Sequence, residues 1–196
     1  MGRYSLKNEL SLQDFILMEK MEAHYYNPEY ITPAEEAYQW HRHNPYTGIV
    51  LAEGKKIVGF LDIVPVSHET CLKIMAGKFN DKDMKTEDVL TPEEMMSKDH
   101  QPISLFVSCA VVHPDYRGKG VTAHLLREYL KQLNQMVSWG IEFEKVVGDC
   151  VTFEGERFSQ KIGMKYLTAS DHGTKIYTGL FSEFVTFITS LAKVGE

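Results

Sequence analysis

The residues best suited to chemistry lie in one short loop, Arg117-Gly118-Lys119-Gly120-Val121-Thr122. Two glycines let the main chain approach a ligand closely, and Arg117 and Lys119 supply positive charge. A helix that begins directly after such a loop points its free N–H groups and the positive end of its dipole at whatever the loop holds. This combination predicts a site for a pyrophosphate or a similar anion.

The elements around the loop have the form that this role needs. The run from Ile103 to Val112 has the length and composition of a buried strand, and Pro114 lacks the backbone donor that would extend its ladder. From Val121 onward, apolar residues recur at three- and four-residue spacing, which predicts a helix with one buried face. That face consists of Leu125, Leu126, Tyr129, Leu130, Leu133, Met136 and Val137.

Three other interpretations of the loop compete with this one. The segment from Gly118 to Ala123 also spells a dinucleotide fingerprint, with Glu142 near the distance expected for a ribose-binding carboxylate. In that fold, however, the first glycine closely follows the strand, whereas His113 to Arg117 intervene here. A Walker loop is excluded because Lys119 is followed by Gly120 and not by Ser or Thr. A glycine-rich turn with solvated basic residues is the alternative without chemistry.

The segment from Val111 to Val121, Val-x-x-Pro-x-Tyr-Arg-Gly-Lys-Gly-Val, resembles the acetyl-coenzyme A loop of the GNAT superfamily of N-acetyltransferases. The family pattern is Gln or Arg, two residues, Gly, one residue, then Gly or Ala. Arg117 and Gly120 match it, and Thr122 occupies the final small position. A threonine there keeps its backbone N–H, so the cradle can still form. The resemblance covers most of residues 1–179.

The resemblance implies an α/β fold with a mixed, largely antiparallel sheet flanked by helices, in a single domain over residues 1–196. The implied activity is acetyl-CoA-dependent transfer of an acetyl group to a primary amine. The acceptor would be a small metabolite, an antibiotic amine, or a peptide N-terminus or lysine. Two alternatives stay open: a non-catalytic coenzyme A-binding regulator of the same fold, and a dinucleotide-dependent oxidoreductase.

The resemblance also assigns residues to the donor, acetyl-CoA. The backbone of Cys109, Ala110 and Val111 is expected along the pantetheine arm, and the amide of Val111 is expected to donate to the thioester carbonyl. Thr152 and the helix after it are expected to contact the arm from the other side. The residues expected to hold the pyrophosphate are Arg117, Gly118, Lys119, Gly120, Val121 and Thr122.

The acid and the base of the reaction are harder to assign. Family members often carry a tyrosine that protonates the leaving thiolate, and here Ser159, a poorer acid, takes its place. Ser159 relays a proton through water, another tyrosine such as Tyr116 reaches in, or no dedicated acid is used. For the base that deprotonates the ammonium, Asp149 near the end of an apolar strand is the first candidate and Asp62 the second. A structural role is the alternative for each carboxylate.

The composition of the chain narrows the classes of function. With 196 residues, of which 43% are hydrophobic and 24% charged, it resembles an ordinary soluble domain. No apolar run could span a membrane and the polar N-terminus lacks a signal-peptide core, so a cytoplasmic protein is expected. A net charge of -6 without any Lys/Arg run argues against nucleic acid as a partner. An acidic body with one basic loop suits an anionic cofactor and a cationic substrate.

The cysteines do not predict a disulfide scaffold or a metal site. Cys71, Cys109 and Cys150 are too few and too widely spaced for either. Cys109 and Cys150 lie in strand-like runs and are expected to be small core residues, with contact to a ligand as the alternative. No metal is inferred.

The remaining elements follow from caps and periodicity. One helix is expected from a Ser11 cap through about Tyr25, and a second from a capping box at Thr32 and Glu35 to Asn44. A further helix is expected at residues 153–162, closed by Gly163. Strands are expected at residues 46–53, 57–66, 145–152, 166–168 and 175–177.

Two segments exceed the minimal family plan. Residues 68–100, with a capping box at Thr91 and Glu94, are expected to form a surface elaboration or a substrate-side flap. Residues 181–192 are expected to form a helix that packs on its own domain, with a homodimer contact as the alternative. The apolar face of that helix consists of Phe181, Phe184, Val185, Ile188 and Leu191.

Overall fold

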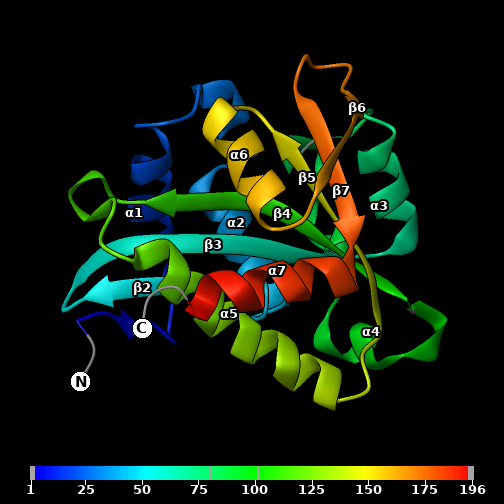
Figure 1. Ribbon diagram of the computed structural model, residues 1–196, viewed down its shortest axis with the longest axis horizontal. Helices are drawn as coiled ribbons and strands as arrows, with labels where there is room; N and C mark the ends of the chain where they lie inside the picture. Colours follow the sequence, from blue (N-terminus) through cyan, green and yellow to red (C-terminus); the bar gives the residue numbers. More distant parts are fainter. Residues whose placement is uncertain (1–2, 80, 101, 194–196) are drawn as a thin grey trace.

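The protein is built on one seven-stranded sheet, in the order β1-β2-β3-β4-β5-β7-β6 (Figure 1). The computed structural model describes residues 3–79, 81–100 and 102–193. All neighbouring strands are antiparallel except β4 and β5, which are parallel. The predicted mixed, largely antiparallel sheet is therefore confirmed. The strands are β1 (Ser5–Leu6), β2 (Gly48–Glu53), β3 (Lys56–Val66), β4 (Ile103–Val112), β5 (Phe143–Cys150), β6 (Lys165–Ala169) and β7 (Lys175–Leu180).

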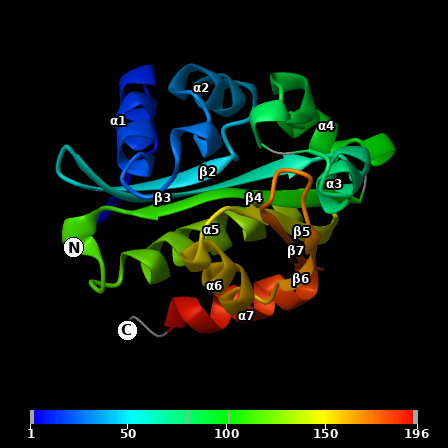
Figure 2. The same ribbon diagram turned by 90° about the horizontal axis from the view of Figure 1, so that it is seen from above.

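Helices cover both faces of the sheet, as Figure 2 shows. We call α1, α2 and α3, on one face, the α1 layer, and α5, α6 and α7, on the other face, the α5 layer. The α-helices are α1 (Leu12–Glu22), α2 (Ala34–His43), α3 (His68–Met75), α4 (Pro92–Met96), α5 (Val121–Ser138), α6 (Phe153–Lys161) and α7 (Phe181–Lys193). Short 3₁₀ turns span Pro28–Tyr30, Asp81–Asp83, Thr86–Asp88, Lys98–His100 and Pro114–Tyr116.

The two layers bury separate sets of side chains because residues alternate along each strand. Phe60 and Val111 pack with Phe15 of α1, whereas Leu61 of the same sheet packs with Leu126 of α5. On the α5 layer, α7 packs on α5 as predicted. The ring of Phe184 meets that of Tyr129 edge-on, with centroids 6.4 Å apart.

The sheet opens at its centre, and this opening positions the site. β4 and β5 pair from Ile103 and Phe143 only as far as Val107 and Gly148. Beyond that point β4 continues along β3, while β5 continues along β7. Because each strand follows a different neighbour, their facing edges separate, and we call this opening the strand gap.

A β-bulge at Ser108 lies where the strand gap begins. Cys109 pairs with Asp62, but Val107 pairs with the very next residue, Ile63, so Ser108 is an extra residue in β4. An extra residue reverses the alternation of side chains. Val107 therefore packs on the side of the α5 layer, and Cys109, two residues later, packs on the side of the α1 layer.

Several local predictions need correction. The capping box at Thr32 and Glu35 does not form. The helix begins at Ala34 after Pro33, and the buried Thr32 hydroxyl has no hydrogen-bond partner in the described part of the chain. The first helix ends at Glu22, so Tyr25 lies beyond it. The short strand β1, which pairs with β2, was not predicted.

The two extra segments take the form of helices. In residues 68–100, α3 packs on β4 and β5, and the predicted capping box at Thr91 and Glu94 is present. The homodimer contact of α7 stays a prediction. Within the described ranges, no helix combines the length and the apolar character needed to cross a membrane.

Candidate functional site

A cavity of about 1020 Å³ lies at the strand gap and reaches both helical layers. Phe15, Glu22 and Asp62 line it on the side of the α1 layer. Leu125 and Phe158 line it on the side of the α5 layer. The cavity therefore connects the two faces of the sheet, so that two ligands approaching from opposite faces could meet there.

The predicted anion loop forms the α5-layer end of this cavity. Gly118 and Gly120 have left-handed backbones, with φ of 71° and 79°, and a Cβ built at either would meet nothing within 4 Å. Gly120 caps α5, and His124 is the first residue of that helix whose amide bonds to a preceding carbonyl, that of Gly120 at 3.1 Å. The amides of the first turn, that of Thr122 included, are left for a ligand.

The two basic residues of the loop lie differently. Arg117 lines the cavity, and its guanidinium forms no hydrogen bond or ion pair with any other residue that the structure describes. Lys119 is absent from the lining, and its ammonium lies 5.6 Å from the ring centroid of Tyr116. The structure therefore brings only the first of the two predicted charges to the cavity.

The register of β4 revises the expected amide donor. His113 N donates to Val58 O at 2.9 Å, so by alternation the amides of Val111 and Cys109 also point toward β3. Ala110 and Val112 present their backbone groups to the strand gap instead. The Tyr25 hydroxyl donates to Val112 O from that side, at 3.0 Å. Hence Val111 is in the lining, but its amide is not the group that faces a ligand.

Helix α6 contributes two hydroxyls, Thr152 at its N-cap and Ser159 in its last turn. Thr152 lines the cavity and caps the helix, its hydroxyl accepting from the Gly155 amide at 3.0 Å. Ser159 also borders the cavity but is only 3% exposed. Its hydroxyl lies 3.1 Å from the thiol of Cys150 and shares a hydrogen bond with it.

On the α1-layer side, acidic groups surround a thiol. Asp62 and Cys109 are paired neighbours on β3 and β4, and Glu22 of α1 lies close enough to act on Cys109. Burial raises the pKa of the Asp62 carboxyl to about 7. Burial, reinforced by Glu22 and Asp62, raises the pKa of Cys109 well above its ordinary value, so this thiol is a poor nucleophile.

Asp149 also lines the cavity from the end of β5. Its neighbour Cys150 packs on the side of the α5 layer, so alternation places Asp149 on the side of the α1 layer. Burial raises the pKa of its carboxyl, and a hydrogen bond from Thr174 and the charge of His172 partly offset this. Its Oδ1 is buried without a hydrogen-bond partner among the described residues.

The predicted alternative acid, Tyr116, does not reach into the cavity with its hydroxyl. That hydroxyl donates to Glu53 Oε2 at 2.6 Å, and this bond is the main cause of its raised pKa. Glu53 is outside the lining and also pairs with Arg3. Tyr116 thus belongs to a charged cluster on the outer side of the loop.

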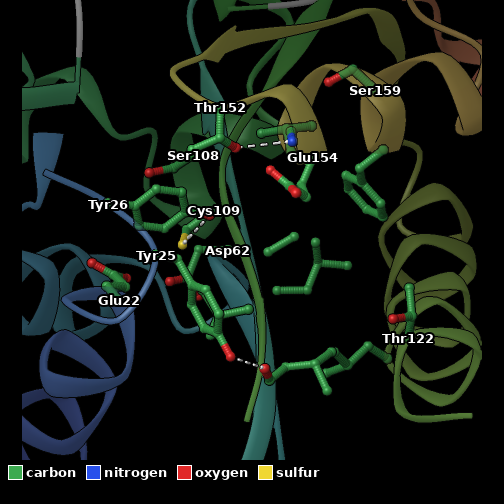
Figure 3. Close-up of a pocket in the computed structure, with 18 of the residues that line it drawn as sticks. Glu22, Tyr25, Tyr26, Asp62, Ser108, Cys109, Thr122, Thr152, Glu154 and Ser159 are labelled. Carbon is green, nitrogen blue, oxygen red and sulfur yellow. Dashed lines mark hydrogen bonds between the residues drawn. The ribbon is translucent and has the colours of Figure 1, made fainter. Parts of the chain in front are cut away.

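Among the lining residues that sequence reasoning missed are Glu22, Tyr25 and Tyr26. Figure 3 shows them facing Asp62 and Cys109, with Thr122 and Ser159 on the opposite side. The thiol of Cys109 donates to the Tyr26 hydroxyl at 3.8 Å. The sequence does contain a signal for this position, a pair of tyrosines directly before the Asn27-Pro28 turn. The prediction of a helix through Tyr25 hid that signal, because α1 ends at Glu22.

The sheet also decides against the dinucleotide interpretation. That fold needs an open, mostly parallel sheet, and here only β4 and β5 are parallel. Glu142, the proposed ribose ligand, lies beyond the far end of α5, next to the start of β4.

Several solved structures share this fold. The loading GNATL domain of CurA from Lyngbya majuscula has a TM-score of 0.61 and 15% identity, with 92% of this chain and 99% of that chain covered. An agmatine N-acetyltransferase has a TM-score of 0.53 and 15% identity, with 92% and 100% covered. Arabidopsis thaliana Naa50, in complex with the bisubstrate analogue CoA-Ac-MVNAL, has a TM-score of 0.56 and 10% identity, also with 92% and 100% covered.

Comparison with the curated proteins finds no match. The family model of the acetyltransferase (GNAT) family, in contrast, matches residues 15–146. This range runs from α1 to the middle of β5 and includes the anion loop, the bulged strand and Asp62. The chain therefore belongs to the GNAT acetyltransferase family.

Proposed function

We propose that this protein is an acetyl-CoA-dependent N-acetyltransferase that acts on a primary amine. The observation that carries the proposal is the strand gap itself. It joins an anion-binding loop and helix terminus on one side to a group of carboxylates on the other. A donor with a pyrophosphate and an acceptor with an ammonium need those two surroundings, close together.

The donor end fits coenzyme A in its chemistry. The loop amides and Arg117 would hold the pyrophosphate, and the edge of β4 would bind the amide groups of the pantetheine arm. From the register, Ala110 or Val112 is the expected amide donor to the thioester carbonyl. Thr152 can donate its hydroxyl proton to the arm, because its oxygen already accepts the Gly155 amide.

The acceptor end would attract and then deprotonate an ammonium. Asp62 suits the role of base best, since a pKa of about 7 keeps it able to accept a proton near neutral pH. Glu22 would add negative charge that draws the cation in. The base takes one proton from the ammonium. In the transfer step the amine nitrogen forms a bond to the acetyl carbon, the carbon–sulfur bond breaks, and the second nitrogen proton passes to the departing thiolate, directly or through water.

The leaving thiolate needs no strong acid. A thiol has a reference pKa of about 8.5, so its anion is a tolerable leaving group at neutral pH. Ser159 already shares a hydrogen bond with Cys150. We therefore propose that the thiolate regains its proton through water, with or without the help of Ser159. A dedicated phenol acid at that position is not required.

The acceptor class stays broad. Two of the similar solved structures differ in acceptor: one is named for a small cationic amine, agmatine, and the other holds a peptide joined to coenzyme A. A small-molecule or peptide amine is therefore proposed for this chain too, in the cytoplasm and without a nucleic-acid partner.

The test combines binding and turnover. Acetyl-CoA at about 100 times its Kd should raise the melting temperature by roughly 5–10 °C, whereas NADH should have almost no effect. A panel of primary amines should then release free coenzyme A, detected with a thiol reagent. Stabilisation without thiol release over a broad panel would favour the non-catalytic regulator, and stabilisation by NADH alone would contradict both.

A further inference from the structure

We propose that Tyr25 positions Arg117 for the pyrophosphate of the donor, so that the α1–α2 connection helps to build the anion site. This inference rests on the proposed function, because it concerns how the same donor is held. The two residues are far apart in the sequence and meet across the cavity that both of them line.

The contact between them is close. The guanidinium carbon of Arg117 lies 4.3 Å from the centroid of the Tyr25 ring, the shortest cation–π distance found among the described residues. A guanidinium at this distance from an aromatic face is attracted by the negative charge density of the ring. The ring therefore restricts where an otherwise flexible side chain can lie.

Stacking leaves the binding groups of the arginine available. A guanidinium is planar, and its N–H groups point outward in that plane, so a ring against its face occupies none of them. None of these N–H groups bonds to any residue in the described ranges. A positioned guanidinium with unused donors suits a pyrophosphate, which accepts two parallel hydrogen bonds from one arginine.

Tyr25 is itself fixed to the sheet. Its hydroxyl donates to Val112 O at 3.0 Å, at the edge of β4 that faces the strand gap. The side chain is half-buried and packs against the hydrophobic cluster under α1. The β4 edge therefore holds the Tyr25 ring in place, and the ring in turn positions Arg117.

Two cations near the loop, Arg3 and Lys56, have carboxylate partners, whereas the guanidinium of Arg117 has none among the described residues. Arg3 pairs with Glu53 at 2.8 Å, and Lys56 pairs with Asp115 at 3.1 Å. Their charges are compensated within the protein. Arg117 has an aromatic partner instead, so its full charge stays directed at a ligand.

The experiment is a double-mutant cycle on coenzyme A affinity, measured by calorimetry with wild type, Tyr25→Leu, Arg117→Ala and the double variant. Tyr25→Leu should weaken binding about three- to tenfold, and should add little once Arg117 is already alanine. Tyr25→Phe keeps the ring and loses only the bond to Val112, so a smaller loss is expected. Tyr30→Leu is the matched control, because it removes another ring from the same cavity lining.

A second ligand tests whether Tyr25→Leu acts through Arg117 or through a general change in the shape of the cavity. Pantetheine has the arm without the pyrophosphate, and its weak binding, followed by ligand-observed NMR, should be the same in wild type and Tyr25→Leu. An equal loss for pantetheine and coenzyme A, additive effects in the cycle, or tighter binding by Tyr25→Leu would each overturn the inference. Absence of coenzyme A binding by the wild-type protein would instead overturn the proposed function.

Discussion

The two ends of the cavity present different kinds of binding groups. At the donor end the binding groups belong mostly to the backbone: two left-handed glycines, the first-turn amides of α5 and the open edge of β4. At the acceptor end they are side chains from separate elements, with Glu22 from α1, Asp62 from β3 and Asp149 from β5. A backbone site depends on local geometry, whereas a side-chain site depends on how the whole sheet is assembled.

This difference suggests that one end of the cavity binds the donor and the other end selects the acceptor. The donor is the constant part of the reaction, and a backbone cradle binds its phosphates through groups that every sequence has. The acceptor has to be chosen, and separate side chains can be exchanged one at a time. Substitutions at the donor end should therefore abolish binding, and substitutions at the acceptor end should change rate and its dependence on pH.

The largest effect is expected at the left-handed cap of α5. Gly120→Val should eliminate measurable coenzyme A binding, because a branched side chain would fill the open space that a Cβ enters there. A side chain at φ 79° also costs stability, by about 1–2 kcal/mol. Calorimetry measures the binding, and urea denaturation measures the stability.

Gly54→Val supplies the matched control for strain. Gly54 has φ of 61° and equally open surroundings, but it lies in the turn between β2 and β3 and outside the cavity lining. It should lose similar stability and keep wild-type affinity for coenzyme A. If both glycine variants bind coenzyme A normally, the loop is not the phosphate site.

The next largest effect concerns the base. Asp62→Asn should lower kcat by about a hundredfold or more while coenzyme A affinity stays unchanged, since a positioned base contributes on that scale. For the wild type, kcat/KM should rise with pH through about 7 as Asp62 loses its proton. Asp149→Asn is the comparison: a larger drop in kcat for that variant would move the base from β3 to β5.

Asp62 also makes a prediction about stability. Its pKa is raised from 3.8 to about 7, so between those values the folded protein holds a proton that the unfolded chain releases. The free energy of unfolding should therefore fall as the pH rises through this window. Asp62→Asn should remove this component, which denaturation at about pH 5 and about pH 8 would detect. An unchanged dependence on pH would show that Asp62 titrates normally.

The contrast between the two ends also explains what the sequence could predict. The loop, the strand before it and the helix after it are contiguous, so residues 103–137 predicted both the elements and the anion site. Glu22, the last residue of α1, and Tyr25, beyond the end of that helix, line the cavity because of how α1 packs on the sheet, which is not a local property of the sequence. The bulge at Ser108, which turns Cys109 toward the α1 layer, has no local signal at all.

The register produced the remaining correction. Val111 matches the family pattern, yet which amides face the strand gap depends on where β3 and β4 begin to pair. A shift by one residue changes the answer, and no periodicity in a uniformly apolar strand reveals it. The sequence also could not show which of the two basic loop residues faces the cavity, because both are cationic and both precede a glycine.

A smaller effect separates those two charges. Arg117→Ala should weaken coenzyme A binding roughly ten- to a hundredfold, as expected for the loss of a charge-assisted contact of about 1.5–3 kcal/mol. Lys119→Ala should change it less than about threefold, because that ammonium lies by the Tyr116 ring at the outer side of the loop. Raising the salt concentration should reduce the difference between the variants. Equal losses for both would mean that the loop binds phosphate through general positive charge.

The smallest effect is expected at Ser159. If its hydroxyl serves mainly to share a hydrogen bond with the Cys150 thiol, Ser159→Ala should cost about 1 kcal/mol of stability and leave kcat within roughly threefold of wild type. Cys150→Ala removes the same bond from the other side, so the two single variants and the double variant should lose similar stability. The rate decides between the two roles, because Cys150→Ala leaves the Ser159 hydroxyl in place. A tenfold drop in kcat for Ser159→Ala alone would show that this serine, at the position of the family tyrosine, relays the proton to the leaving thiolate.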